Sequence, residues 1–76
     1  MSLGADRIRT DFNPSKSSAV DMLKQSAAKF IDQCNALNDK TTDPEVGRCI
    51  QLAMDHAETA AMYAVKAATS PKLTNS

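Results

Sequence analysis

The sequence predicts an all-α fold: an antiparallel helical hairpin with a short N-terminal arm, assembling as a homo-oligomer. Apolar residues recur at spacings of three and four over residues 18–38 and again over residues 43–70, as in helices with apolar faces. The connector between them, residues 38–42, is short and polar, so the helices are expected to lie antiparallel. A single domain of 76 residues buries a small core, and association of copies is a common way to stabilise it.

Residues 1–17 show no clear period and are predicted to form the arm, with room for a short helical turn. Asn13 precedes Pro14, which pushes it out of the helical region and marks a turn. The arm carries Phe12, one of only three aromatic residues in the chain. We therefore expect Phe12 either to pack against the hairpin or to contact a ligand.

The first long helix is predicted over residues 18–38, with Ser18 and Asp21 at the spacing of a capping box. Its apolar residues follow a heptad-like stripe that is expected to face the core, while the opposite face is polar. The stripe consists of Val20, Leu23, Ala27, Phe30, Cys34 and Leu37, widened by Ile31, and the polar face of Asp21, Lys24, Gln25 and Asp32.

The second long helix is predicted over residues 43–70. Asp43 or Thr42 can cap it, Pro44 suits a first helical turn, and Ser70-Pro71 ends it before a polar tail, residues 71–76. Two apolar stripes run along this helix. One is expected to pack against the first helix and the other to contact a second copy of the chain. The stripes are Val46, Ile50, Ala53, Ala57, Ala60 and Ala64, and Ile50, Met54, Ala61, Val65 and Ala68.

The net charge is zero, which argues against a general DNA- or RNA-binding protein. The charges are segregated, however: residues 1–30 and 59–76 together sum to +4, and residues 31–58 to −4. A hairpin would place the basic segments at its open end, where Arg7, Arg9, Lys24 and Lys66 could form a cluster. No long apolar run and no signal-peptide pattern is present, so we expect a cytoplasmic protein with no membrane contact.

Catalytic and metal-binding patterns are weak. No nucleophile elbow or other catalytic spacing occurs, so we expect no enzymatic activity and no cofactor. His56 with Asp55 and Glu58 offers too few ligands for a metal site, and His56 is expected to be a solvated helix residue. Cys34 and Cys49 lie about equally far from the connector; they could form a disulfide, but in a cytosolic chain reduced, buried thiols are the favoured interpretation.

The basic cluster has two interpretations, a solvated surface or an anion site. Lys66 lies in an apolar stretch, where its ammonium needs water or an anion. Ser26 can donate a hydroxyl hydrogen bond, Asn13 supplies an amide, and Phe12 supplies a ring for stacking. Together a cation, a hydroxyl, an amide and an aromatic ring match the phosphate and base of a nucleotide.

Two segments also carry a family resemblance: Arg7-x-Arg9-Thr10-Asp11-Phe12-Asn13-Pro14-Ser15, and the run from Ala60 to Thr69, AAMYAVKAAT. With the lysine-bearing first helix between them, they resemble the small phage anti-CBASS sponge proteins, which share a helical-hairpin domain with the anti-Thoeris sponges. The resemblance implies a homohexamer in the cytoplasm of the infected bacterial host. It also implies sequestration of cyclic oligonucleotide messengers, 3′,3′-cyclic dinucleotides between paired subunits and cyclic trinucleotides on the threefold axis.

By the same resemblance, Phe12 stacks on a base of the cyclic dinucleotide and Lys24 meets its phosphate. Asn13, Ser26 and Lys66 correspond to the cyclic trinucleotide set. Two positions depart from the pattern: lysine stands at 66 where arginine is common, and tyrosine at 63 where tryptophan is expected. Lysine lacks the bidentate fork of arginine.

Two hypotheses follow. The first is a non-enzymatic sponge that lowers the free concentration of the messenger and thereby blocks host anti-phage CBASS signalling. The second is a helical oligomerisation or scaffold module without a small-molecule ligand. A scaffold needs the alanine-rich faces but neither the arm nor Lys24, whereas a sponge needs both.

Overall fold

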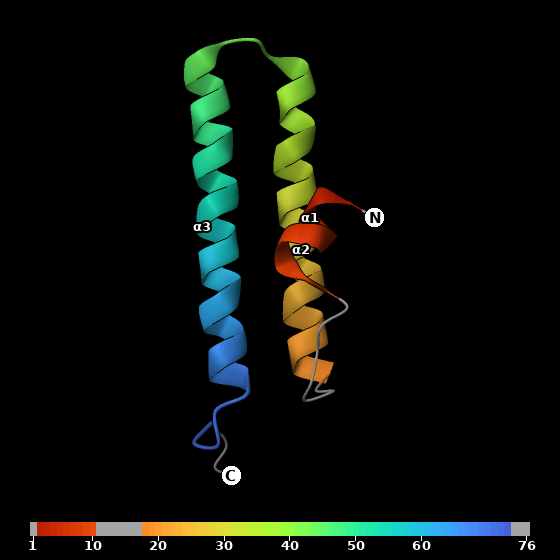
Figure 1. Ribbon diagram of the computed structural model, residues 1–76, viewed down its shortest axis with the longest axis vertical. Coiled ribbons are helices and arrows are strands. Elements are labelled where there is room, and N and C mark those ends of the chain that lie inside the picture. Colours follow the sequence, from red (N-terminus) through yellow and green to blue (C-terminus); the bar gives the residue numbers. More distant parts are fainter. Residues whose placement is uncertain (1, 11–17, 74–76) are drawn as a thin grey trace.

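The structure is a computed structural model that describes residues 2–10 and 18–73. Within these ranges the chain forms α1 (Leu3–Ile8), α2 (Ser18–Leu37), the 3₁₀ turn η1 (Asn38–Lys40) and α3 (Pro44–Ala68). Helices α2 and α3 run antiparallel as the two arms of a hairpin, and α1 lies beside the middle of α2 (Figure 1). The predicted all-helical hairpin is therefore confirmed for the described residues.

Helix α3 begins where its capping residues require. The Asp43 carboxylate accepts hydrogen bonds from the backbone N–H groups of Glu45 (2.8 Å) and Val46 (3.2 Å), and Pro44 follows in the first turn. At the other end, the Thr69 N–H and hydroxyl both donate to the carbonyl oxygen of Val65. The helix thus ends at Ala68, two residues before the predicted end at residue 70.

The short helical turn expected in the N-terminal arm is present as α1, and it packs against the hairpin. Ser2 caps it, because its hydroxyl accepts a hydrogen bond from the Ala5 N–H at 3.0 Å. Gly4 and Ile8 are buried. The Gly4 N–H donates to Asp32 Oδ1 on α2 at 2.6 Å, so the backbone of α1 lies directly against that helix. A six-residue helix is unstable alone, and these contacts with the hairpin stabilise it.

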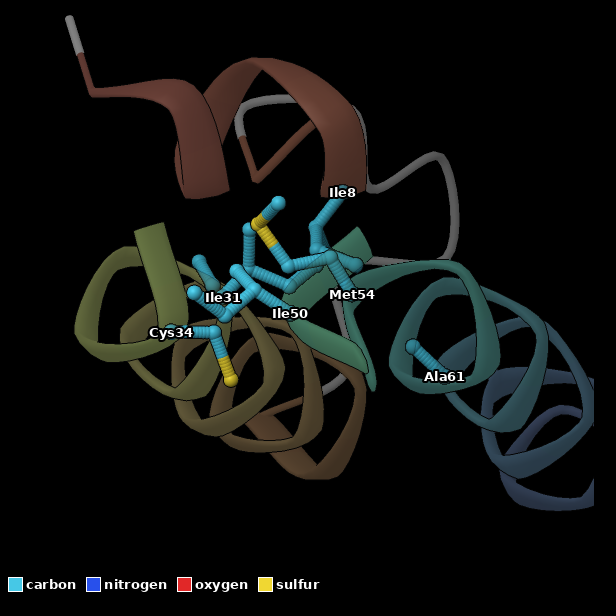
Figure 2. Close-up of a cluster of buried hydrophobic side chains, with 7 residues drawn as sticks. Ile8, Ile31, Cys34, Ile50, Met54 and Ala61 are labelled. Atoms are coloured by element: carbon cyan, nitrogen blue, oxygen red, sulfur yellow. The ribbon is translucent and has the colours of Figure 1, made fainter. Parts of the chain in front are cut away.

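The core lies where the three helices meet (Figure 2). Ile31 and Met54 are 0% and 1% exposed, and Ile8 covers the cluster on the side of α1. The cluster comprises Ile8, Ala28, Ile31, Cys34, Ile50, Met54 and Ala61, with the alanines at 27, 53 and 57 packed against it.

The predicted core stripe of the first long helix is wrong in part. Val20, Ile31 and Cys34 are buried, but Leu23, Phe30 and Leu37 are 36%, 48% and 48% exposed. The physical reason is α1, which a pattern of two long helices does not anticipate. It covers the side of α2 that carries Lys24, Ala28 and Asp32, so part of the predicted polar face is buried instead of part of the predicted stripe.

Polar residues are tolerated under α1 because its backbone supplies their partners. Asp32 accepts the Gly4 N–H near the start of α1, and Lys24 donates to the carbonyl oxygen of Arg9 at its end. Lys24, predicted on the polar face, is only 7% exposed. A buried polar group costs little free energy when it is hydrogen-bonded.

On α3 the stripe containing Ile50, Met54 and Ala61 is the one buried within the protomer. The other stripe is more open, with Val46 45% exposed and Ala60 also exposed. Among the described residues, no helix is both long and apolar enough to cross a membrane.

The two cysteines occupy different environments. Both are free thiols; Cys34 is buried in the core, whereas Cys49 is exposed. The disulfide alternative is absent from the structure, and the expectation of two buried thiols is wrong for Cys49. The buried stripe of α3 consists of Ile50, Met54 and Ala61, and Cys49 lies outside it.

Candidate functional site

A pocket of about 610 Å³ opens beside the end of α1, between α1, α2 and α3. We call it the Lys24 pocket. Its charged lining comprises Arg7 of α1, Arg9 directly after α1, Lys24 of α2, and Asp55 and Glu58 of α3. Ile8, Ala61, Met62 and Val65 add an apolar wall. Its volume falls in the range of small-molecule sites, about 300–1,000 Å³.

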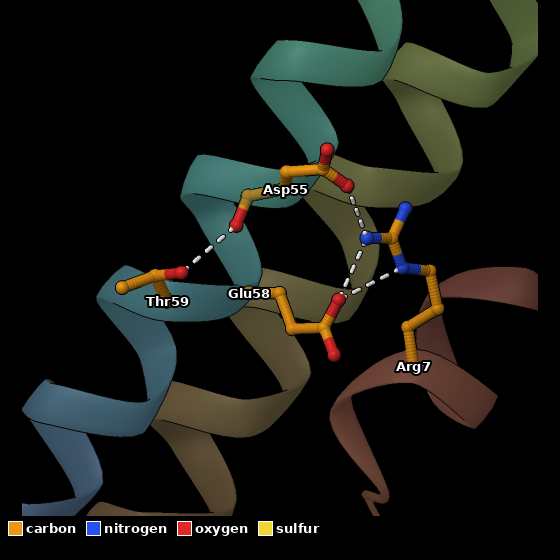
Figure 3. Close-up of polar contacts among 4 residues, drawn as sticks. All are labelled: Arg7, Asp55, Glu58 and Thr59. Atoms are coloured by element: carbon orange, nitrogen blue, oxygen red, sulfur yellow. Dashed lines mark hydrogen bonds and ion pairs between the residues drawn. The ribbon is translucent and has the colours of Figure 1, made fainter.

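Arg7 is held on one side of this pocket by two carboxylates of α3 (Figure 3). Its Nη2 lies 2.8 Å from Asp55 Oδ1 and 2.6 Å from Glu58 Oε1, and its Nε donates to the same Glu58 oxygen at 3.0 Å. The hydrogen bond to Asp55, and after it those to Glu58, raise the pKa of the Arg7 guanidinium above its ordinary value. The prediction that Arg7 belongs to an open basic cluster is therefore wrong, because α1 brings it to the acidic part of α3.

Lys24 reaches the pocket from beneath α1. Its ammonium donates to the Arg9 carbonyl oxygen at 3.2 Å. Arg9 caps the end of α1 with φ 59° and ψ 57°, a left-handed conformation that is uncommon for a residue with a side chain. Its N–H donates to the Ala5 carbonyl oxygen at 2.8 Å. The end of α1 thus contributes both to the pocket wall and to the placement of Lys24.

A second, shallower hollow of about 380 Å³ lies along the hairpin between α2 and α3. Leu23, Ser26 and Phe30 of α2 border it on one side, and Ala57, Ala60 and Ala64 of α3 on the other. We call it the alanine groove. Apart from the Ser26 hydroxyl its named side chains are apolar, so it suits a hydrophobic partner better than an anion.

Within one protomer, the three predicted ligand residues that the structure describes lie in three different places. Lys24 lines the pocket, Ser26 borders the alanine groove, and Lys66 is exposed on α3 and lines neither. Phe12 and Asn13 lie outside the described residues.

Sequence reasoning missed the roles of Asp55, Glu58 and Asp32 in fixing α1. A signal was available for two of them, because residues three apart share a helix face, and Asp55 and Glu58 can therefore bind one cation together. Gly4 gave no signal, since only its approach to α2 shows why a side chain is excluded there.

Metal binding and nucleophilic chemistry gain no support from the described part of the chain. Within residues 2–10 and 18–73, no three His, Cys, Asp or Glu residues are grouped so as to hold a metal ion. His56 is exposed, and its neighbours Asp55 and Glu58 bind Arg7 instead. The Thr59 hydroxyl beside the Lys24 pocket donates to the Asp55 carbonyl oxygen at 3.2 Å. The Lys24 pocket combines three cations with two carboxylates and an apolar wall, and both carboxylates bind Arg7.

A comparison with protein families gives a match to the Acb2/Tad1 hairpin domain over residues 4–69. The chain belongs to the Acb2/Tad1 hairpin family. The match includes α1 and both arms of the hairpin, and it confirms the resemblance to the anti-CBASS and anti-Thoeris sponges. Membership in the Acb2/Tad1 family implies a sponge role toward cyclic oligonucleotides in broad terms, a role of binding rather than catalysis. No curated protein and no solved structure matches the sequence.

Proposed function

We propose that this protein is a sponge that sequesters cyclic di- and trinucleotide messengers and so blocks host anti-phage CBASS signalling. It would act as a homohexamer in the cytoplasm of the infected bacterial cell. The observation that carries the proposal is the family match, supported by the Lys24 pocket, because a sponge needs cations for phosphate and Arg9 and Lys24 line this pocket.

The cyclic dinucleotide is assigned to Lys24 and Phe12. A cyclic dinucleotide carries two phosphodiester charges on a ring, so it loses little conformational entropy on binding and a few groups can hold it tightly. Lys24 would donate a charge-assisted hydrogen bond to a phosphate, and Phe12 would stack on a base. The low exposure of Lys24 supports this role, since electrostatic attraction is screened less at a partly buried ammonium than at an exposed one.

The cyclic trinucleotide is assigned to a second site with Asn13, Ser26 and Lys66. Ser26 and Lys66 do not line the Lys24 pocket, which supports separate sites for the two ligands. Lys66 is exposed and would present a point charge to the ligand.

Self-association is proposed through the alanine groove, with a second copy of the chain as its occupant. Phe30 is 48% exposed beside alanines that allow a neighbouring helix to approach closely. A large apolar residue next to small ones is a surface that association can bury. The proposed number of six subunits is what the family resemblance implies.

Calorimetric titration with 3′,3′-cyclic dinucleotides and cyclic trinucleotides tests the proposal. We expect saturable binding of both classes, weak binding of the linear dinucleotides, and chemically unchanged ligand after recovery. If no cyclic oligonucleotide binds while the chain remains oligomeric, the scaffold hypothesis replaces the sponge.

Variants then separate the two sites. Phe12→Ala and Lys24→Met should each weaken cyclic dinucleotide binding about tenfold, the loss of one stacking or charge-assisted contact, and leave trinucleotide binding largely unchanged. Asn13→Ala and Lys66→Ala should do the reverse. Lys29→Met, which removes an exposed cation of α2 outside both hollows, is the matched control and should change neither. Equal weakening of both ligands by all four variants would indicate one shared site.

A further inference from the structure

Helix α1 is fixed to both arms of the hairpin by polar contacts along its length. Near its start the Gly4 N–H donates to Asp32 of α2, and at its end the Arg9 carbonyl oxygen accepts from Lys24 of α2. Between these, Arg7 binds two carboxylates of α3. Because a helix of six residues has little stability of its own, its position depends on these contacts.

The position of α1 matters for Lys24. A buried ammonium needs hydrogen-bond acceptors, and the Arg9 carbonyl oxygen is one that α1 brings to it. If α1 shifted along or away from α2, that oxygen would move, and the Lys24 ammonium would lose this hydrogen bond and with it one restraint on its position in the pocket wall.

We propose that the ion pairs of Arg7 with Asp55 and Glu58 are a positioning element for the phosphate site at Lys24. They tie α1 to α3 and thereby keep the Arg9 carbonyl oxygen over the Lys24 ammonium. This inference rests on the proposed function for its ligand, a cyclic dinucleotide, and goes beyond it by assigning a role to two acidic residues in an anion site.

The acidic residues make the inference testable through the sign of the effect. Asp55 and Glu58 line a pocket proposed to hold a ligand with two negative charges, so Coulomb repulsion alone predicts that neutralising them strengthens binding. Positioning predicts the opposite, because without the carboxylates Arg7 no longer holds α1. The double variant Asp55→Asn with Glu58→Gln keeps the size of both side chains and removes only their charge.

We expect this variant to bind cyclic dinucleotide about fivefold to tenfold more weakly by calorimetry, with trinucleotide binding unchanged. The matched control is Asp39→Asn with Glu45→Gln, two exposed acidic residues outside the pocket, which changes the net charge equally. It should leave both affinities within about twofold. Unchanged or tighter dinucleotide binding by the Asp55 and Glu58 variant would overturn the inference.

A charge exchange separates positioning from direct contact of Arg7 with the ligand. Arg7→Glu should weaken dinucleotide binding, and adding Glu58→Arg restores an ion pair of reversed direction between α1 and α3. We expect the combined variant to regain most of the affinity lost by Arg7→Glu, although no cation remains at position 7. Failure to regain any affinity would contradict the positioning role.

A measurement without ligand keeps this inference distinct from the proposed function. Amide hydrogen exchange over residues 4–9 should be faster in the Asp55→Asn, Glu58→Gln variant than in the parent and the control, because α1 opens more often. If the parent binds no cyclic dinucleotide, the proposed function fails, while the exchange rates still decide whether these carboxylates hold α1. Equal exchange in all three proteins would overturn the inference.

Discussion

The packing of α1 on α2 can be tested by adding a single methyl group at Gly4. A Cβ atom built on Gly4 would overlap the carbonyl oxygen of Ala28, and it would lie 2.7 Å from the carbonyl carbon of Ala28 and 2.8 Å from Asp32 Oδ1. The overlap is with backbone, so no change of side-chain rotamer relieves it. Gly4→Ala should therefore force α1 away from α2.

The expected cost follows from the contacts that α1 makes. Moving α1 lengthens the Gly4–Asp32 hydrogen bond, worth about 1.5–3 kcal/mol with its charged acceptor, and exposes part of Ile8, worth about 1.5–3 kcal/mol when fully buried. Alanine recovers about 0.5–1 kcal/mol through its better helix propensity, and a released α1 regains backbone entropy. We expect a net destabilisation of about 1–3 kcal/mol, the usual range for overpacking.

Urea denaturation followed by circular dichroism, at one fixed protein concentration, measures this change. The matched control is the same substitution at the other glycine, Gly47, in α3. Among the described residues, no atom outside its own helical backbone and its two chain neighbours lies within 4 Å of a Cβ built there, so Gly47→Ala should stabilise the protein by about 0.5–1 kcal/mol. Two identical substitutions are thus predicted to have opposite signs. If Gly4→Ala is as stable as Gly47→Ala, the close packing of α1 is wrong.

The remaining predictions concern the cysteines and the assembly. Cys34→Ala should cost about 1–3 kcal/mol because the thiol is buried, whereas Cys49→Ala should stay within about 0.5 kcal/mol; equal denaturation midpoints would contradict the difference in burial. Ala60→Glu places a charge on the exposed side of the alanine groove and should reduce the molar mass of the assembly measured by light scattering, while helicity is retained. An unchanged molar mass would exclude this groove as the contact between copies. Ala61→Glu, by contrast, is expected to destabilise the hairpin itself and to lower its helicity, because Ala61 is 8% exposed within one protomer.

The sequence by itself predicted the helical hairpin, because helices, their caps and a short connector depend on residues that are close together in the chain. Asp43 and Pro44 set the start of α3, and the spacing of its apolar residues defined two stripes; the structure decided that the stripe with Ile50, Met54 and Ala61 is the buried one. The short connector required α3 to return beside α2. The family resemblance lies in segments of the same kind, so it too follows from the sequence alone, and the match over residues 4–69 confirms it.

Only the tertiary structure decided what α1 does. Its few residues show no periodicity, and its place on α2 depends on a backbone contact at Gly4 and on pairs 28 and 51 positions apart in the sequence, Gly4 with Asp32 and Arg7 with Glu58. Because α1 covers one side of α2 and reaches α3, Lys24 is buried and Arg7, expected in a basic cluster, is bound by carboxylates. A helical period shows which residues share a face, but which neighbour covers that face is decided by contacts between residues distant in the chain.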